Sequence, residues 1–191
     1  MKAKAIVSTG VRKVEIQEIE IAEMAVRDIL VELEATAISV GTEAYVLSTD
    51  RYPRPYIPGY SPVGGIIAAG EKASGLYSIG ERVTYFQPNK PLYTIQNCGG
   101  HQSPAIMNVN PDRLAKSNLY CEKVTVFLSS ERAAFGGISS ISCLGVSLAR
   151  QNVGDKALLV GQGMIGQLAA QHLKLRGAEV AVADLYGKRL M

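Results

Sequence analysis

The sequence predicts an α/β protein with a large β part, in which a β-rich first half leads into one β-α-β unit. Short apolar or alternating segments separated by glycine and proline fill the first 85 residues, and helix patterns begin near residue 130. A glycine-rich turn between a strand and a helix follows near residue 161. We therefore divide the chain into residues 1–128, a β-rich domain, and residues 129–191, a crossover helix followed by the β-α-β unit.

The composition and charge indicate a globular protein without a nucleic-acid partner. The 191 residues are 47% hydrophobic and 19% charged, with a formal net charge of +3. Basic and acidic residues number 15 and 14 up to residue 150 and 5 and 3 beyond it, so the positive charge has no focus. The uncharged stretch 133–149 holds several glycines and serines, and no basic start leads into an apolar run. We therefore expect no membrane span, no secretory signal and a cytoplasmic location.

Four segments of the first half predict strands of a small barrel or a strongly curved sheet. Ile29–Ala37 and Val14–Gln17 alternate apolar with polar residues, as half-buried strands do. Val63–Ala69 is an apolar run bounded by glycines, and Gly80–Val83 is a turn that enters a strand. Helix signals are nearly absent from this half.

Helix and strand patterns alternate in the second half. Ser130 predicts a helix N-terminus because its hydroxyl can accept from exposed N–H groups, and the small residues up to Arg150 suit a closely packed helix. Lys156–Val160 is an apolar strand of the kind that is buried on both faces of a parallel sheet. Gln167–Arg176 predicts a helix, and Glu179–Ala183 predicts a second strand.

The glycine motif Gly161-Gln-Gly-Met-Ile-Gly166 stands between that first strand and the helix, and Asp184 lies 23 positions beyond its first glycine. A G-x-G-x-x-G motif in this setting is the dinucleotide-binding fingerprint of the Rossmann fold. Each glycine has its own reason: Gly161 for the tight turn, Gly163 for close approach of the pyrophosphate, and Gly166 for close packing of helix on strand. The alternative is a glycine-rich turn without a ligand.

The rest of the predicted cofactor site follows from the chemistry of a helix N-terminus. Unpaired N–H groups near Met164 and Ile165 attract the pyrophosphate. Asp184 accepts from the ribose hydroxyls and repels a 2′-phosphate, which favours NAD, while Lys188 and Arg189 leave NADP open. We interpret His172, farther along the helix, as a packing or surface residue rather than a catalytic one.

Four further segments, taken in chain order, resemble motifs of the zinc-dependent alcohol dehydrogenases. Ala37–Glu43 resembles their G-I-C-G-T-D, Ile57–Gly64 their P-G-H-E-x-x-G, Gly80–Val83 their G-D-R-V, and Asn110–Lys116 their V-x-x-x-x-L-x-K. Together with the fingerprint, they make the chain similar to the medium-chain dehydrogenase/reductase superfamily. The resemblance implies a GroES-like β-barrel catalytic domain followed by the start of a Rossmann domain.

The departures from these motifs fall on the metal ligands. This chain has Ser39 or Val40 where zinc members have a liganding Cys, Tyr60-Ser61 where they have His-Glu, and Gly137-Ile138 near the third ligand. A catalytic zinc needs about three protein ligands. The resemblance therefore implies a zinc-lacking branch, such as the one with the hydroxyethyl dehydrogenases of the bacteriochlorophyll pathway, and no metal-binding residue is predicted.

The cysteines also lack the spacing of a metal site. Cys98, Cys121 and Cys143 match neither a disulfide framework nor a paired-cysteine zinc site, so we expect reduced thiols. Cys98 stands alone where the resemblance implies a four-cysteine structural lobe.

The length is a second departure from the superfamily, whose members continue through a six-stranded cofactor sheet. Two parallel strands and one helix do not cover both faces of such a sheet. We therefore expect the chain to be a fragment of a longer protein or to complete its sheet with a partner, and whether it forms a homo-oligomer stays open.

Without a metal, the charge on a substrate oxygen must be stabilised by hydrogen-bond donors. The resemblance points to Thr42, at the position of a proton-relay hydroxyl, and to Tyr60, at the position of the liganding His. These two are the predicted catalytic residues, with packing as the alternative for Tyr60. We expect Glu43 to brace its loop rather than act as a base, and His101 to be exposed rather than to line a cleft.

An aromatic and proline cluster precedes Tyr60. It consists of Tyr52, Tyr56 and Tyr60 with Pro53, Pro55 and Pro58. The cluster predicts either the wall of an apolar substrate pocket or a rigid loop, and the two interpretations are compatible.

The function predicted from these features is a zinc-independent, NAD(H)-linked oxidoreductase that interconverts an alcohol and a ketone in a small-molecule substrate. One alternative is reduction of an activated double bond in an enone or quinone. The other is an inactive binding module that keeps the barrel without catalysis.

Overall fold

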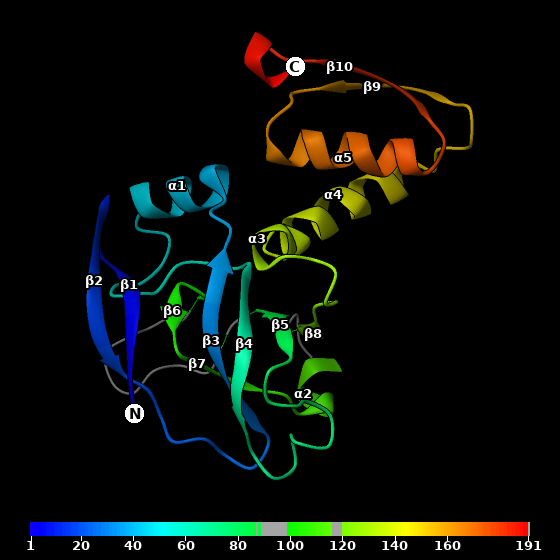
Figure 1. The fold of residues 1–191 in the computed structure, drawn as a ribbon. Helices are drawn as coiled ribbons and strands as arrows, with labels where there is room; N and C mark the ends of the chain where they lie inside the picture. The colour runs from blue at the N-terminus through cyan, green and yellow to red at the C-terminus, as the bar shows by residue number, and fades with distance from the viewer. Residues whose placement is uncertain (87, 89–98, 116–119, 191) are drawn as a thin grey trace. The chain divides into compact units, whose positions relative to one another are not determined.

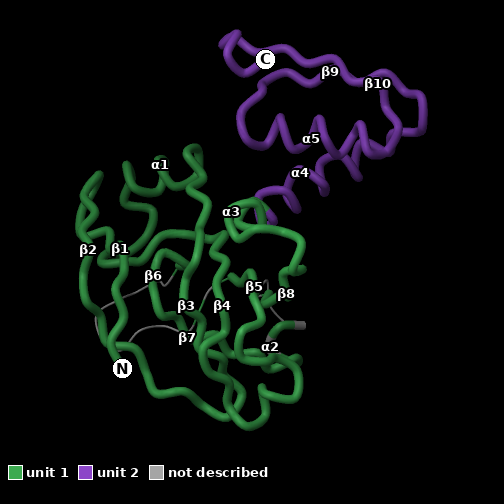
Figure 2. The backbone as a smooth tube through the Cα atoms, in the orientation of Figure 1, with its two compact units in different colours: residues 1–135 green, residues 136–191 purple. Residues whose placement is uncertain are grey.

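The computed structural model describes residues 1–86, 88, 99–115 and 120–190. These form two compact units, residues 1–135 and 136–191, which are considered separately (Figure 2). The division predicted between residues 128 and 129 lies before helix α3 (Ser130–Ala133), which the structure groups with the first unit.

The first unit is built from two antiparallel sheets (Figure 1). The larger has the order β7-β3-β4-β5-β8, with strands Ala105–Asn108, Asp28–Thr36, Pro62–Ala69, Arg82–Tyr85 and Cys121–Lys123. The smaller has the order β2-β1-β6, with strands Lys13–Glu20, Lys2–Gly10 and Gln102–Ser103. All of these pairings are antiparallel. The β-rich first half is therefore confirmed.

Strand β3 lies between two hydrophobic clusters of this unit. Ile29 and Val31 belong to one cluster, with Ile66, and Leu30 belongs to the other, with Val7. The start of β3 is thus buried on both faces, whereas the sequence pattern predicts a half-buried strand throughout. Burial of each such side chain contributes about 1.5–3 kcal/mol, so β3 contributes to the stability of both clusters.

Two helices of the first unit were not expected from the sequence. They are α1 (Val40–Ser48) and α2 (Pro111–Ala115). Helix α1 contains a glycine and two valines, which are poor helix formers. Its C-terminal end is held instead by Arg54, whose guanidinium donates to the carbonyls of Leu47 at 3.4 Å and Thr49 at 2.7 Å. Tertiary contacts thus override a weak local signal.

The helix predicted from Ser130 to Arg150 is two helices, α3 and α4 (Gly136–Leu148). Ser129 rather than Ser130 caps α3, since its hydroxyl accepts from the N–H of Arg132 at 3.4 Å. Ser130 instead accepts from Arg82 at 2.9 Å and donates to Glu34, which joins α3 to the large sheet.

The second unit contains α4 and a β-α-β unit of β9 (Lys156–Val160), α5 (Met164–Leu175) and β10 (Glu179–Ala183), followed by a short 3₁₀ turn (Gly187–Arg189). The two strands are parallel and in register from Lys156 opposite Glu179 to Val160 opposite Ala183. These elements confirm the predicted strand, helix and strand.

The expectation that β9 is buried on both faces was wrong for the part of the chain that the structure describes. Ala157 and Leu159 pack against the apolar cluster of α4 and α5, whereas Leu158 and Val160 are 68% and 80% exposed. The reason is that helices cover only one face of this two-stranded sheet.

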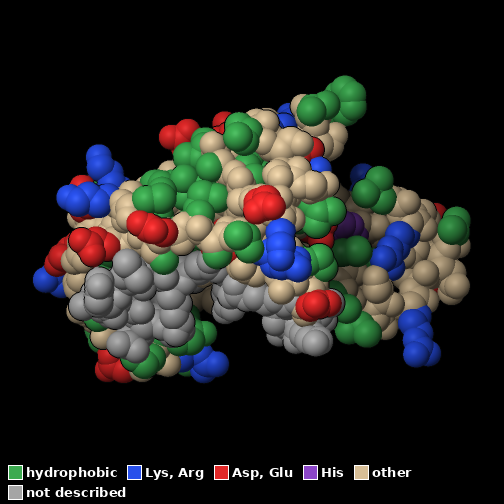
Figure 3. Space-filling model, turned by 90° about the horizontal axis from the view of Figure 1, so that it is seen from below, with side chains coloured by type: hydrophobic (Ala, Val, Ile, Leu, Met, Phe, Trp, Pro, Cys, Tyr) green, Lys and Arg blue, Asp and Glu red, His purple; other side chains and the backbone are tan. Residues whose placement is uncertain are grey.

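No helix within the described ranges is long and apolar enough to cross a membrane. On the face drawn in Figure 3, Lys and Arg side chains are interspersed with Asp and Glu, and neither sign forms a continuous patch.

Candidate functional site

The turn between β9 and α5 has the backbone geometry that its glycines predict. Gly161 has φ of +95°, a conformation that side chains disfavour. A Cβ on Gly166 would lie 1.9 Å from the carbonyl oxygen of Gly161, so only glycine allows the helix to approach the strand this closely. A Cβ on Gly163 would have no heavy atom within 4 Å, which leaves the backbone open to a ligand.

Helix α5 begins at this turn without a side-chain cap. Gly163 is the N-cap residue, with extended backbone, and no side chain accepts from the first turn of the helix. The first N–H groups of a helix have no intrahelical acceptor, and together with the helix dipole they favour an anion. Met164 and Ile165 provide these groups here, as the sequence predicts.

Asp184 lies against the glycine turn at the end of β10. Its Oδ2 accepts from the N–H of Gln162 at 2.6 Å, and its Oδ1 accepts from the N–H of Tyr186 at 2.8 Å. Arg189 approaches Oδ2 at 3.4 Å and stacks on the Tyr186 ring, 4.8 Å from its centroid. The Gln162 N–H, then the Tyr186 N–H and Arg189, hold the pKa of the Asp184 carboxyl below its ordinary value.

These contacts leave Asp184 with spare acceptor capacity. A carboxylate has about four lone-pair sites, and the described contacts use one on Oδ1 and two on Oδ2. A ribose hydroxyl can therefore donate to Oδ1, while a 2′-phosphate would meet an ionised carboxylate. Lys188, four residues farther along the chain, is exposed.

The two predicted catalytic residues lie in the first unit. Thr42 is exposed in the first turn of α1, and Tyr60 is half-buried in the turn before β4. The Tyr60 carbonyl accepts from the Tyr120 hydroxyl at 3.4 Å. No hydrogen bond joins the Thr42 and Tyr60 side chains among the described residues, but their neighbours in sequence, Glu43 and Gly59, both contact His101.

The expectation that His101 is exposed was wrong. Its residue exposure is 6%, and its Nε2 lies 3.0 Å from Oε1 of Glu43, which is equally buried. Glu43 also braces α1, because its Oε2 accepts from the N–H of Ser39 at 2.8 Å. The sequence signal for the burial of His101 lies in glycines that pack against it. A Cβ on Gly59 would lie 2.6 Å from Nδ1 of His101, so only glycine leaves room for the ring.

Two more glycines bring the His101 segment close to the turn that carries Tyr60. A Cβ on Gly99 would lie 2.3 Å from the carbonyl oxygen of Pro58, and one on Gly100 would lie 2.4 Å from the Pro62 ring. Backbone hydrogen bonds of 2.7 Å join Gly99 to Ile57 and Gly100 to Gly59. The Gly-Gly-His sequence thus encodes close packing, which sequence reasoning missed.

The aromatic and proline cluster makes the contacts of a rigid loop. Tyr56 is 3% exposed, its ring meets that of Tyr52 edge-on at 5.8 Å, and its backbone pairs with Ser8. Arg54 lies over the Tyr56 ring at 5.8 Å and donates to the Ser8 hydroxyl. The pocket interpretation of this cluster stays a prediction.

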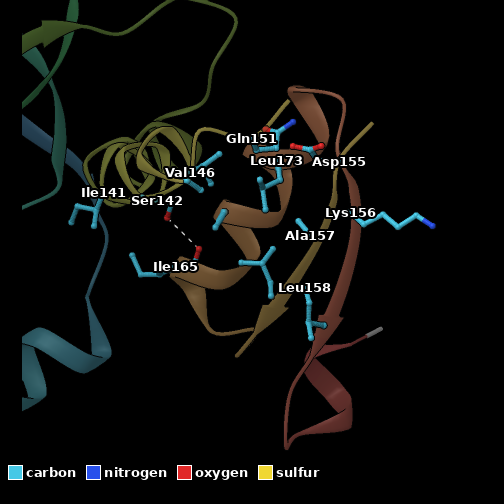
Figure 4. A pocket seen from close by; sticks show the side chains of 14 residues that line it. Ile141, Ser142, Val146, Gln151, Asp155, Lys156, Ala157, Leu158, Ile165 and Leu173 are labelled. Carbon is cyan, nitrogen blue, oxygen red and sulfur yellow. Dashed lines mark hydrogen bonds between the residues drawn. The ribbon is translucent and has the colours of Figure 1, made fainter. Parts of the chain in front are cut away.

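The second unit has a cavity of its own. About 600 Å³ lies among α4, α5 and β9, lined mainly by apolar side chains (Figure 4). The Ser142 hydroxyl on the cavity lining donates to the carbonyl of Ile165 at 3.2 Å. The Lys156 side chain extends away from the cavity (Figure 4). His172 packs nearby between helices, 2.9 Å from the Ser139 hydroxyl.

The residues that the structure describes contain no group of three His, Cys, Asp or Glu side chains placed to hold a metal ion. Cys121 is buried, Cys143 is partly exposed, and both are free thiols, whereas Cys98 lies outside the described residues.

Comparisons with known proteins agree with this architecture. Escherichia coli has an oxidoreductase/dehydrogenase of unknown specificity whose crystal structure superposes with a TM-score of 0.82 at 18% identity, covering 100% of this chain and 59% of that one. The chain has the fold of the medium-chain dehydrogenases. No known family model matches the sequence.

The chain is also similar in sequence to two curated dehydrogenases. A sorbitol dehydrogenase of Bombyx mori is 25% identical over 203 aligned positions, covering 97% of this chain and 58% of the relative. The 2-desacetyl-2-hydroxyethyl bacteriochlorophyllide A dehydrogenase of Cereibacter sphaeroides is 26% identical over 187, covering 95% and 56%. The chain therefore spans less than three fifths of the length of these relatives.

Proposed function

We propose that this chain is part of a zinc-independent, NAD(H)-dependent oxidoreductase of the medium-chain dehydrogenase/reductase superfamily that interconverts an alcohol and a ketone. The observation that carries the proposal is the open backbone at Gly163, set between the uncapped start of α5 and the Asp184 carboxylate. The dehydrogenase names of the curated relatives support the same reaction class.

The residues present fit a dinucleotide. Gly161 and Gly163 would carry the diphosphate on bare backbone, the N–H groups of Met164 and Ile165 would bind its oxygens, and Asp184 would accept from a ribose hydroxyl. When bound, the cofactor supplies or accepts the hydride. The preference for NAD rests on the ionised Asp184, which would repel a 2′-phosphate.

The chain's own residues would manage the proton and the charge on the substrate oxygen. A hydroxyl donor, Thr42 or Tyr60, would hydrogen-bond to that oxygen and stabilise the negative charge that develops during reduction. In the other direction, the same hydroxyl oxygen would accept a hydrogen bond from the alcohol and pass its own proton to water, so that the alcohol proton is released to solvent. Zinc independence is supported by Glu43 and His101, two described residues of ligand type near this site, because each already bonds the other.

A fluorescence titration with NADH tests the cofactor site. Gly163→Val should fold, because Gly163 has φ of −70° and open space around its α-carbon, yet its side chain should block the diphosphate. We expect NADH affinity to fall at least about tenfold, equivalent to about 1.4 kcal/mol. Gly75→Val, also in open space and in the other unit, is the matched control. Unchanged binding by Gly163→Val would contradict the proposal.

Product analysis with NADH separates the reaction classes. The full-length protein should reduce ketones from a mixed panel and leave enones unreduced at carbon. Reduction of the double bond would instead identify an enone or quinone reductase, and NADH binding without turnover of any panel member would identify a binding module. Metal analysis that finds one zinc per chain would refute zinc independence.

A further inference from the structure

Glu43 and His101 form a buried hydrogen-bonded contact with no role in the function as proposed so far. Their side chains are only 8% and 5% exposed, and Oε1 of Glu43 lies 3.0 Å from Nε2 of His101. Polar groups of this kind are costly to bury unless every atom finds a partner. Their retention here therefore calls for a physical reason.

Every polar side-chain atom of the pair is engaged. Oε2 of Glu43 accepts from the Ser39 N–H at 2.8 Å, and Nδ1 of His101 lies 3.1 Å from the Thr36 hydroxyl. An ionised carboxylate only accepts, so Nε2 must carry a hydrogen and the neutral ring has one tautomer, with Nδ1 accepting from Thr36. The contacts fix both side chains in position and orientation.

A buried hydrogen bond between a carboxylate and an imidazole is a poor source of stability, because desolvation of the polar groups offsets most of the attraction. Well-packed apolar residues often serve stability equally well, whereas a hydrogen-bonded pair also sets geometry. The pair fits a role in setting geometry, since its two residues come from segments far apart in sequence.

The segments that the pair joins are those of the two candidate donors. Glu43 follows Thr42 in the first turn of α1, and the His101 ring lies on the α-carbon of Gly59, which precedes Tyr60. The His101 N–H also donates to the Pro58 carbonyl at 3.1 Å. The pair thus connects the backbone of one donor to the backbone of the other.

We propose that Glu43 and His101 are positioning residues of the oxidoreductase site, holding the Thr42 turn and the Tyr60 turn in fixed relation. The proposal rests on the function proposed above, and it assigns neither residue a contact with substrate. A displacement of about 1 Å in a catalytic group can cost about a hundredfold in rate, so loss of the pair should act on kcat.

Steady-state kinetics of His101 variants in the full-length protein test this role. His101→Phe keeps a ring against Gly59 but removes both nitrogens, and we expect kcat to fall about 10- to 100-fold with the Kd for NADH unchanged. His101→Gln places an amide near the Nε2 position, and it should recover most of kcat. His172→Gln, which removes the other imidazole and its 2.9 Å serine contact in the second unit, is the matched control.

If the pair only stabilised the fold, its loss would lower the fraction of folded protein, and kcat per folded site would stay the same in every variant. Rates are therefore expressed per NADH-binding site. A folded His101→Phe with wild-type kcat would overturn the proposal, as would equal loss in His101→Gln. If His101→Phe does not fold, Glu43→Asp decides: its shorter stem cannot reach both Ser39 and His101, and an undiminished kcat refutes the role.

The kinetic outcomes separate this inference from the proposed function. A wild-type protein that binds no NADH and turns over no panel member refutes the function itself. Wild-type turnover with unaffected variants refutes the positioning role alone. The tautomer gives a readout without activity: ¹⁵N spectra of wild type and of His101→Phe assign the His101 signals, and the Nε2 of His101 should carry the hydrogen. An Nδ1-protonated neutral ring would contradict the described pair.

Discussion

Asp184 and Gln162 are joined by a hydrogen bond of 2.6 Å from the Gln162 N–H to the carboxylate, which ties the end of β10 to the glycine turn after β9. One side chain therefore shapes the turn and, in the proposed function, also accepts from the ribose. Since its pKa is lowered by this N–H first, Asp184 is ionised at neutral pH and presents a negative charge there.

Asp184→Asn should shift cofactor preference toward NADPH. The amide keeps the size of the side chain and an oxygen for the Gln162 N–H, but it removes the charge that opposes a 2′-phosphate. Lys188 and Arg189 then face the phosphate without a competing carboxylate, and we expect the ratio of NADPH to NADH affinity to rise about tenfold, or about 1.4 kcal/mol. Fluorescence titration of both cofactors measures the ratio.

The control for that variant is Asp155→Asn, because Asp155 also accepts from a backbone N–H, that of Asn152 at 2.7 Å, and is distant in sequence from the end of β10. An unchanged ratio in Asp184→Asn, or an equal change in Asp155→Asn, would show that Asp184 does not set the preference.

Stability should depend on pH through the same carboxyl. Its pKa is lowered by folding, so it stabilises the folded state fully above its ordinary value of 3.8, and this contribution is lost as pH falls through the lowered value in the folded protein. The advantage of wild type over Asp184→Asn should therefore be constant near neutral pH and shrink below about pH 4. Urea unfolding at a series of pH values measures it, and an advantage that grows on acidification contradicts the sign.

The sequence predicts the second unit better than the helices of the first. Gly161, Gly163 and Gly166 form a local pattern whose meaning depends on flanking residues alone, so strand, turn and helix were found together. Helix α1 depends on Glu43 at one end and on Arg54 at the other, and neither contact is visible in local periodicity. Its low propensity therefore concealed it.

The candidate catalytic site was predictable only in part for the same physical reason. Thr42 and Tyr60 follow from the resemblance of short motifs. His101 contacts their sequence neighbours, Glu43 and Gly59, because segments distant in sequence pack closely. Its only local sign is the pair of glycines before it, which indicates tight packing without naming the partner. Exposure was therefore the wrong expectation for a histidine that three glycines allow into the interior.

Gly166→Ala should destabilise the second unit, because its Cβ would lie 1.9 Å from the carbonyl oxygen of Gly161, a backbone atom that cannot move aside alone. Overpacking of this kind costs about 1–3 kcal/mol. Gly145→Ala is the matched control, since Gly145 lies inside α4 with no heavy atom within 4 Å of a new Cβ. Helix propensity predicts that it stabilises by up to about 1 kcal/mol. Urea unfolding measures both, and equal stability of the two variants would show that α5 has room to shift from β9.

Cys121 should be the slower of the two described thiols to react. Burial raises the pKa of the Cys121 thiol to about 12, so almost no thiolate exists at pH 8, whereas Cys143 is partly exposed beside Arg176, whose Nη2 lies 3.8 Å from its sulfur. Because the thiolate is the nucleophile, iodoacetamide should label Cys143 first. Mass spectrometry of peptides taken at timed intervals measures the order, and labelling in urea provides the control in which both thiols react at similar rates. Faster labelling of Cys121 in the folded protein would mean that β8 opens readily and that Cys121 does not stay in the core.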